Sequence, residues 1–308
     1  MTSRAVHWAH IGESTCAAGI WFLYGVHAVV GRRVLRALLW PVVLFYACTQ
    51  PRARRASLEY LGRMEAMYGV IGTPPGTRHW LRHLMSFAET LVDKLMASAG
   101  RYPWATLRIE GQAQVDALVA QRRGALLVTA HVGCLELCQA LAGRLPELKL
   151  TVLVHTRHAE NFNRILRRLN PANRVELLQV TEVNAATAVE LERRVRAGEF
   201  VAIAGDRIPV TGGRTTTVPF LGERAAFPVG AYVLASLLAC PLVLLGCVRE
   251  GAGHTVRFEM LAERVVLQRA DREAALQHWA TLFAQRLEAL LVRAPYDWFN
   301  FYPFWAKA

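Results

Sequence analysis

His131 is well placed for acid–base chemistry, because a carboxylic acid, Glu136, follows it five positions later. A carboxylate that bonds one nitrogen of an imidazole fixes the tautomer of the ring and stabilises its protonated form. The other nitrogen is then free to take a proton from a hydroxyl group. Spacing alone is weak evidence, since ten His and 24 acidic residues in 308 positions produce about one such pair by chance.

Two further pairs with the same spacing, His155/Glu160 and His254/Glu259, have less favourable surroundings. The second pair flanks a predicted strand, where an odd separation sends the two side chains to opposite faces. The first pair follows a predicted strand, but no glycine turns the chain after it and arginines crowd it. We therefore set both pairs aside.

His131 ends an apolar strand, and Gly133 permits a sharp turn directly after it. Glu136 then falls in the first turn of a predicted helix and folds back toward the imidazole. The sequence thus predicts His131 as a general base and Glu136 as its partner, an arrangement that suits acyl transfer. The N–H groups of the helix start beside Gly133 could hold the oxyanion of a thioester or ester carbonyl. The alternative for His131 is a hydrogen-bonded histidine of the core.

Asp206 follows the predicted strand at residues 200–204 and precedes Arg207. It could orient a substrate hydroxyl or form a structural ion pair with an arginine. Arg207, Arg214 and Arg224 frame a glycine-rich loop that could bind a phosphate or a phosphopantetheine arm. Scattered, solvated arginines explain them equally well. Without a G-x-G-x-x-G or P-loop pattern, we predict no nucleotide site.

The elements that position these residues alternate between short β-rich runs and helical segments beyond residue 102. The predicted strands are residues 125–130, 150–154, 175–180, 200–204, 241–245 and 256–260. The predicted helices are residues 135–142, 159–169, 185–197, 228–239 and 276–290. This pattern predicts an α/β fold with a largely parallel central sheet flanked by helices. Ligand sites in such sheets lie at the carboxyl ends of strands, where His131 stands.

The N-terminal part of the chain is apolar and basic. Residues 14–31 contain no charged side chain, and a second apolar run at 37–47 follows a basic patch. The first run is marginal for a span of about 20 residues, and the second is short and carries Pro41. One crossing of the bilayer and a position in its interface both stay open, as do two buried helices of a soluble domain. The arginines at 52–55 favour a cytoplasmic position for the chain that follows.

An apolar stripe at helical spacing runs from Trp80 to Leu95, so the helical N-terminal part is expected to end near Gly100. We predict an N-terminal helical, membrane-associating region at residues 1–100 and an α/β acyltransferase domain at 101–308. No signal peptide is convincing, so the N-terminus is expected to be retained.

Composition limits the partners. The net charge of +12 attracts nucleic acid, anionic lipid or an acidic carrier protein. Nucleic-acid binding is disfavoured, because the cations are spread over an apolar, helix-rich chain. The six cysteines form no C-x-x-C pair, which argues against a zinc ribbon and for buried thiols in a reducing compartment. The chain also lacks the G-x-S-x-G elbow of an α/β-hydrolase.

Three blocks of the sequence together carry a resemblance to a known family. They are the strand-ending His131-x4-Glu136, the block Ala204-Gly205-Asp206-Arg207 with Val218-Pro-Phe-Leu-Gly-Glu-Arg-Ala-Ala226, and the aromatic end Trp298-Phe-Asn-Phe-Tyr-Pro-Phe-Trp305. In this order they resemble the lysophospholipid acyltransferase superfamily, nearest the lauroyl/myristoyl acyltransferases of lipid A biosynthesis. The similarity runs through most of the chain.

The resemblance implies transfer of a fatty acyl chain from acyl carrier protein, or from acyl-CoA, to a hydroxyl of a lipid-like acceptor, without metal or cofactor. It implies a site on the cytoplasmic side of the inner membrane. By position, His131 resembles the general base of the family, Glu136 its partner and Asp206 an acid after the fourth strand. An arginine after the third strand is also expected to bind substrate, with Arg157 favoured and Arg164 next.

Two departures leave the acceptor open between lipid A and another lipid or a polyene. Lipid A enzymes often show a D-x-D-like segment where this chain reads Asp206-Arg207-Ile208, and this chain ends in aromatic residues rather than in a more basic tail. The aromatic density of this end suits an acyl groove, a membrane boundary or a final core segment equally well. Two other functions stay possible, a non-catalytic acyl- or lipid-binding protein and a hydrolase of lipids or thioesters.

Overall fold

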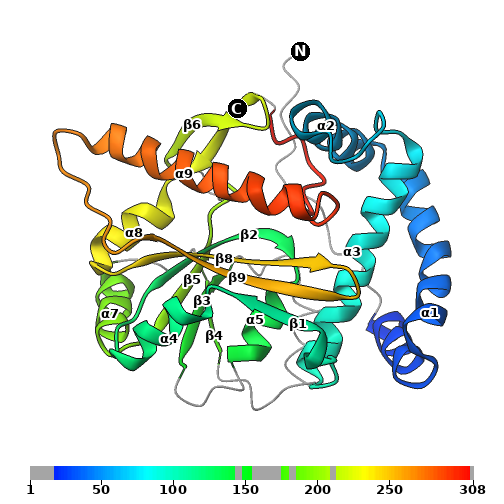
Figure 1. Ribbon diagram of the computed structural model, residues 1–308, viewed down its shortest axis with the longest axis horizontal. Helices are drawn as coiled ribbons and strands as arrows, with labels where there is room; N and C mark the ends of the chain where they lie inside the picture. The colour runs from blue at the N-terminus through cyan, green and yellow to red at the C-terminus, as the bar shows by residue number, and fades with distance from the viewer. Residues whose placement is uncertain (1–16, 143–147, 155–174, 180–184, 209–212, 306–308) are drawn as a thin grey trace.

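The protein is described here from a computed structural model, which covers residues 17–142, 148–154, 175–179, 185–208 and 213–305 (Figure 1). The helices in these ranges are α1 (Ala17–Thr49), α2 (Pro51–Tyr68), α3 (Thr77–Ser98), α4 (Gln112–Ala120), α5 (Leu135–Ala142), α7 (Ala185–Arg196), α8 (Gly230–Leu238) and α9 (Arg272–Arg293). The strands are β1 (Leu107–Glu110), β2 (Leu126–Gly133), β3 (Leu150–Val154), β4 (Glu176–Gln179), β5 (Phe200–Ala204), β6 (Thr215–Phe220), β7 (Glu223–Pro228), β8 (Leu242–Glu250) and β9 (Gly253–Ala262).

The central sheet has seven strands in the order β1-β9-β8-β2-β5-β3-β4. The neighbours from β8 to β4 pair in parallel, whereas β9 is antiparallel to β8, and β1 is parallel to β9. The reversal has a local cause, because Gly251 adopts a positive φ of 61° in the two-residue turn between β8 and β9. The predicted α/β class is confirmed, with a mostly parallel, mixed sheet.

The central strands β2, β5 and β8 are mostly buried, which explains why they are largely apolar rather than alternating. Leu126 and Val128 of β2 point into a hydrophobic cluster formed with α2, α7, α8 and α9. Ala125 and Leu127 point into a second cluster formed with α1, α3, α4 and α5. Figure 1 shows the long α9 lying across one face of the sheet and α4 on the opposite side.

The sequence missed the elements with weak local signals. A two-stranded hairpin, β6–β7, turns at Leu221-Gly222, where both residues have a positive φ. This is the geometry of a type I′ turn, but leucine is an unusual residue in its first position. The short strand β1 and the helix α4 were also not predicted. The helix predicted at residues 159–169 lies outside the described residues.

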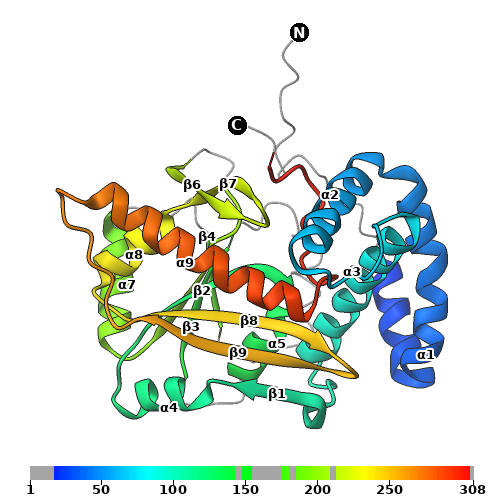
Figure 2. The same ribbon diagram turned by 45° about the horizontal axis from the view of Figure 1, so that its top comes forward.

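Helices α1, α2 and α3 stand together at one end of the sheet (Figure 2). α3 packs against both α1 and α5, so it connects the N-terminal helices with the helix that follows the His131 end of β2. The predicted division at residue 100 falls just after α3 ends, and it stays a prediction. In the described part of the chain no helix passes a length and hydropathy test for a membrane span on its own. The segments Val34–Thr49 and Pro51–Tyr68, which meet at 96°, pass it only as a pair.

Candidate active site

Neighbouring parallel strands bring His131 and Asp206 to the same edge of the sheet. Thr129 of β2 lies opposite Ala204 of β5, and the Gly205 N–H donates to the Thr129 carbonyl at 2.8 Å. His131 stands near the end of β2, where the pairing with β8 shifts register between Thr129 and Gly133. Such irregularities bend a strand and re-aim its side chains. Two residues that are 75 positions apart in the chain therefore meet.

The Asp206 carboxylate holds His131 through both of its oxygens. Its Oδ1 lies 2.7 Å from the imidazole Nδ1, and its Oδ2 accepts the backbone N–H of His131 at 2.9 Å. The indole N–H of Trp298 donates to the same Oδ2 at 3.1 Å. Asp206 is buried, whereas the His131 side chain is 38 % exposed. A buried acid thus fixes a ring that a substrate can reach.

The charges favour a neutral imidazole beside an ionised carboxylate. Burial raises the pKa of Asp206, but the positive charge of His131 when it is protonated, its hydrogen bonds and the Arg207 guanidinium outweigh burial and bring the pKa to about 2. Burial of the ring lowers the pKa of His131 below 6.5, and the Arg207 guanidinium lowers it further, against the opposing effect of Asp206. At neutral pH the Nδ1–H therefore donates to Asp206. The Nε2 lone pair is left to accept a proton.

The structure corrects the predicted partner of His131. Glu136 forms no hydrogen bond with the imidazole; its Oε1 lies 2.8 Å from the Lys94 Nζ of α3. The Glu136 side chain was expected to fold back over the turn, but α5 packs against α3 and the Lys94 ammonium binds its carboxylate. The position that Glu136 was predicted to occupy is taken by Asp206. A signal for Asp206 existed, because it follows an apolar strand as His131 does.

Gly133 allows the chain to turn sharply into α5. It has a φ of +58°, and a Cβ atom at this position would lie 1.8 Å from the Cys247 carbonyl oxygen of β8. The Gly133 N–H donates to the Asp297 carbonyl at 2.8 Å, and the Cys134 N–H donates to the Cys247 carbonyl at 3.2 Å. Both hydrogen bonds hold the turn. The N–H groups at the start of α5, which begins at Leu135, were expected to bind an oxyanion, and this stays a prediction.

The aromatic C-terminal segment pairs with the end of β2 next to His131. Val132 and Trp298 form an isolated antiparallel bridge, and the Phe299 N–H donates to the His131 carbonyl at 3.1 Å. The Trp298 side chain is fully buried, so this part of the segment belongs to the core. His83 Nε2 donates to the Trp298 carbonyl at 2.9 Å, and the Ser57 hydroxyl donates to His83 Nδ1 at 2.8 Å. The roles of Trp298 and Lys94 were not foreseen from the sequence.

The predicted arginines separate into three groups. Arg207 lies at the site: it donates to the Phe299 carbonyl at 3.1 Å, and its charge acts on His131. Arg214 pairs with Glu273 of α9, and Arg224 donates to the Thr217 carbonyl of its own hairpin, so neither joins His131. The two arginines predicted to bind substrate, at positions 157 and 164, lie outside the described residues.

Of the two other His/Glu pairs with the same spacing, His254/Glu259 lies within the described residues. His254 Nδ1 lies 2.9 Å from the Tyr102 hydroxyl, whereas Glu259 pairs with Arg257 and Arg286. His254 and Glu259 therefore do not meet, as the strand geometry predicted. The pair at positions 155 and 160 lies outside the described residues. Within the described residues, no group of three or more His, Cys, Asp or Glu side chains is arranged to hold a metal ion.

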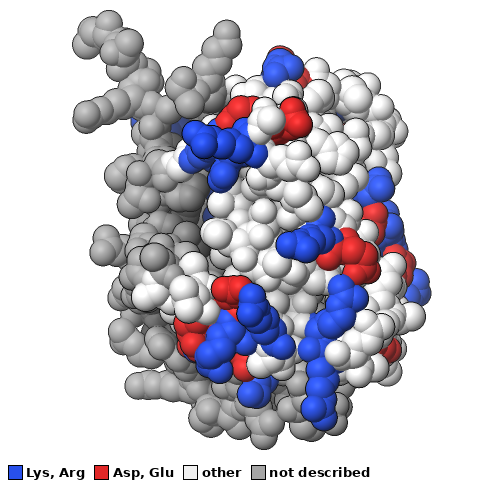
Figure 3. Space-filling model, turned by 90° about the vertical axis from the view of Figure 1, so that its left-hand side faces the viewer, with Lys and Arg blue, Asp and Glu red and all other residues white. Residues whose placement is uncertain are grey.

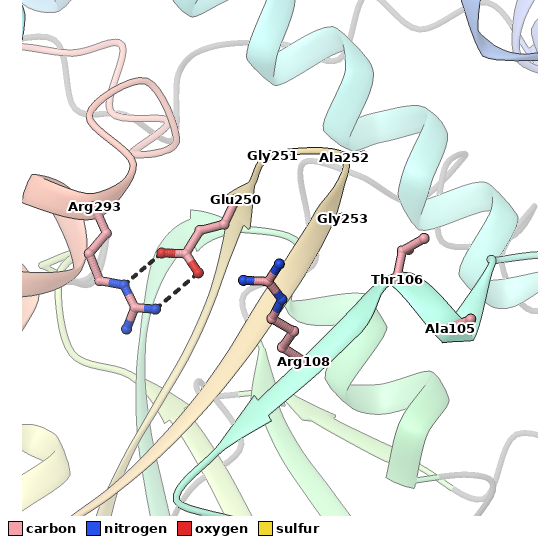
Figure 4. A pocket seen from close by; sticks show the side chains of 8 residues that line it. All are labelled: Ala105, Thr106, Arg108, Glu250, Gly251, Ala252, Gly253 and Arg293. Carbon is pink, nitrogen blue, oxygen red and sulfur yellow. Dashed lines mark hydrogen bonds and ion pairs between the residues drawn. The ribbon is translucent and has the colours of Figure 1, made fainter.

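A cleft of about 680 Å³ opens beside the β8–β9 turn and β1. Arg293 of α9 pairs there with Glu250, and the Arg108 side chain projects between β1 and the turn (Figure 4). Its lining includes neither His131 nor Asp206. The cleft is therefore not the place where the candidate base acts.

Charged side chains are mixed rather than segregated on the face where α7 lies. Figure 3 shows Lys and Arg interspersed with Asp and Glu on this side of the molecule. On α7 itself Arg193 and Arg194 pair with Glu190, and Arg196 pairs with Glu192. These pairs neutralise much of the local charge, so this helix offers no continuous basic surface to a polyanion.

Comparison with known proteins identifies the family of the chain. The family model of bacterial lipid A biosynthesis acyltransferases matches residues 84–307, which include most of α3, the whole sheet and the aromatic end. A search of curated proteins found no match. Because the family model covers well over half of the chain, the chain belongs to the bacterial lipid A biosynthesis acyltransferase family.

Proposed function

We propose that the protein moves a fatty acyl chain from an acyl thioester, carried by acyl carrier protein, to a hydroxyl of a lipid-like acceptor. Family membership indicates an acyltransferase. The observation that carries the finer proposal is the His131–Asp206 pair, in which a neutral, accessible imidazole is fixed by a buried carboxylate. Such a pair suits removal of a proton from a hydroxyl nucleophile.

In the proposed reaction the acceptor hydroxyl gives its proton to Nε2 of His131 while its oxygen attacks the thioester carbonyl carbon. The carbonyl π electrons move to oxygen and form a tetrahedral oxyanion. When the C=O bond re-forms, the C–S bond breaks and the thiolate takes the proton from the imidazolium. The products are an ester and a free carrier thiol, and His131 returns to its starting state. Asp206 stabilises the transient imidazolium through Nδ1.

The basic charge of the chain supports an acidic carrier protein as donor. Opposite net charges steer two proteins together, and salt screens that attraction. We expect purified protein to transfer a labelled acyl chain from acyl carrier protein to a hydroxyl lipid. The KM for the carrier should rise when NaCl is increased from about 50 mM to about 500 mM.

The same assay, run with a panel of hydroxyl acceptors and with acyl-CoA in parallel, separates the other functions. Free fatty acid that forms without dependence on any acceptor would identify a hydrolase. Tight binding of acyl carrier protein without any product would identify a non-catalytic binding protein. Either result would contradict the proposal.

We propose further that α1 holds the protein on the cytoplasmic surface of the inner membrane. α1 carries a set of large apolar side chains that are exposed to solvent, of which Phe45 is 62 % exposed. The set is Val34, Leu38, Trp40, Val42, Leu44 and Phe45. Exposed arginines at the start of α2, Arg52, Arg54 and Arg55, lie directly after it in the chain. Apolar side chains beside cations suit insertion into an anionic lipid surface.

This surface predicts binding to vesicles of phosphatidylethanolamine and phosphatidylglycerol. The double variant Leu38→Glu/Phe45→Glu should lose most of the vesicle-bound fraction in a flotation assay, because each change puts a charge into the apolar surface. A matched control, Val189→Glu/Leu237→Glu, adds the same charges at two apolar positions of α7 and α8 that are also exposed. Equal losses in both double variants would contradict α1 as the docking element.

A further inference from the structure

Lys94 places a positive charge beside the first turn of α5, the helix that follows His131 in the chain. It belongs to α3, its side chain is 21 % exposed, and its ammonium lies 2.8 Å from Glu136 Oε1. Burial disfavours the charged ammonium, but the Glu136 carboxylate outweighs burial, so the pKa of Lys94 lies above its ordinary value of 10.5. Lys94 is therefore charged throughout the physiological range.

The charge of Lys94 reaches the candidate base. It contributes to the lowered pKa of His131, and it also interacts with Arg207. A cation beside a general base disfavours the protonated imidazole, which is a cost for proton transfer. That cost is offset if the same cation stabilises negative charge that appears on the substrate in the same step.

Acyl transfer creates such a negative charge, and two backbone amides of the turn after His131 are already bonded within the protein. The amides of Gly133 and Cys134 already donate to the Asp297 and Cys247 carbonyls. An ammonium has three N–H donors, and within the described residues Lys94 uses one of them on Glu136. The other two N–H groups of this ammonium can donate to a substrate oxygen.

Glu136 then acts through Lys94. Its Oε1 binds the ammonium, while its Oε2 is buried and forms no hydrogen bond within the described part of the chain. The Glu136 side chain is only 20 % exposed, and a mostly buried carboxylate is costly unless a cation neutralises it. The pair thus fixes the long Lys94 side chain in one position, as an oxyanion-binding group requires.

We propose that Lys94, positioned by Glu136, is the cationic group that stabilises the oxyanion of the thioester carbonyl. This inference rests on the acyl-transfer function proposed above. The acceptor oxygen forms its bond to the carbonyl carbon, the negative charge on the carbonyl oxygen is met by the Lys94 ammonium, and the hydroxyl proton is on His131. Collapse of the intermediate breaks the C–S bond, and the proton passes to the thiolate.

The test compares kcat and KM of three variants in the labelled acyl-transfer assay. Lys94→Met keeps the length of the side chain and removes its charge, so kcat should fall about 10²-fold or more while KM changes little. Lys94→Arg keeps the charge and should retain more activity than Lys94→Met. Lys149→Met is the matched control. Lys149 directly precedes β3, is 71 % exposed and pairs with Glu199. It should leave kcat unchanged.

A purely structural role for the Lys94–Glu136 pair predicts a different pattern. Removing one partner leaves a buried charge, whereas the double variant Lys94→Met/Glu136→Gln removes both charges and should fold even if the single variant does not. If the pair is only structural, the double variant recovers wild-type kcat; if Lys94 binds the oxyanion, kcat stays low.

The pH profile supplies a second readout. Loss of the Lys94 charge removes one cause of the lowered pKa of His131. The acidic limb of kcat/KM should therefore move to higher pH in Lys94→Met. Wild-type kcat in a folded Lys94→Met protein, with an unmoved limb, would overturn this inference and leave the acyl-transfer function intact. Absence of acyl transfer in the wild-type protein would overturn both.

Discussion

Replacing His131 with asparagine should lower kcat/KM for acyl transfer by at least about 10³-fold while the protein stays folded. The asparagine amide nitrogen takes the place of Nδ1 and can still donate to Asp206 Oδ1, so the buried carboxylate keeps a partner. The base nitrogen, Nε2, is lost. Steady-state rates with labelled acyl carrier protein measure the effect, and circular dichroism with thermal unfolding checks the fold.

His131→Ala should lose as much activity but also some stability, because Asp206 is left buried with one partner fewer. His278→Ala is the control, since His278 is exposed on α9 and should not affect the rate.

In the wild-type enzyme the neutral imidazole is the active form. Since the pKa of His131 lies below 6.5, kcat/KM should be level at neutral pH and fall as the pH drops through that pKa. Near-normal turnover by His131→Asn would end the assignment of the base.

Replacing Asp206 with asparagine should lower kcat by about 10³- to 10⁴-fold through the tautomer of His131. Oδ2 accepts two hydrogen bonds, from the His131 backbone N–H and from the Trp298 indole, so the amide oxygen must take that position. The amide NH₂ then faces Nδ1, which has to become an acceptor. The ring proton moves to Nε2, and the base nitrogen is no longer free.

Asp297→Asn is a matched control for this substitution. Asp297 is also buried, but its side chain accepts from Ser86 and from the Arg249 N–H, without contact to the imidazole. The Asp297→Asn variant should keep most of the activity. Full activity in Asp206→Asn would show that Asp206 does not set the tautomer of His131.

The stability of the Asp206 variant gives a second check on the same carboxylate. The folded-state pKa of Asp206, about 2, is below its value in an unfolded chain, so ionised Asp206 stabilises the fold at neutral pH. That contribution disappears as the pH falls toward 2. The gap in unfolding temperature between Asp206→Asn and wild type should therefore narrow on acidification.

Local patterns in the sequence determined the elements that carry the chemistry. The helix predicted at residues 135–142 and the strands at 150–154 and 200–204 have the same bounds in the structure, and His131 lies near the end of β2 as expected. These elements are marked by continuous apolar runs that glycines and polar residues interrupt, a signal contained within a few residues of chain. The position of His131 and of Asp206 at the ends of buried strands was readable for the same reason.

The tertiary structure alone decided which side chains meet. Which strand lies beside β2 depends on the order of the whole sheet, and the parallel pairing of β2 with β5 brings Asp206 to His131 across 75 residues. The packing of α3 on α5 takes Glu136 to Lys94 instead of the imidazole. The sequence favoured Glu136 because spacing reports only local proximity, whereas a hydrogen bond in a buried site goes to whichever partner the packing of distant segments brings within reach.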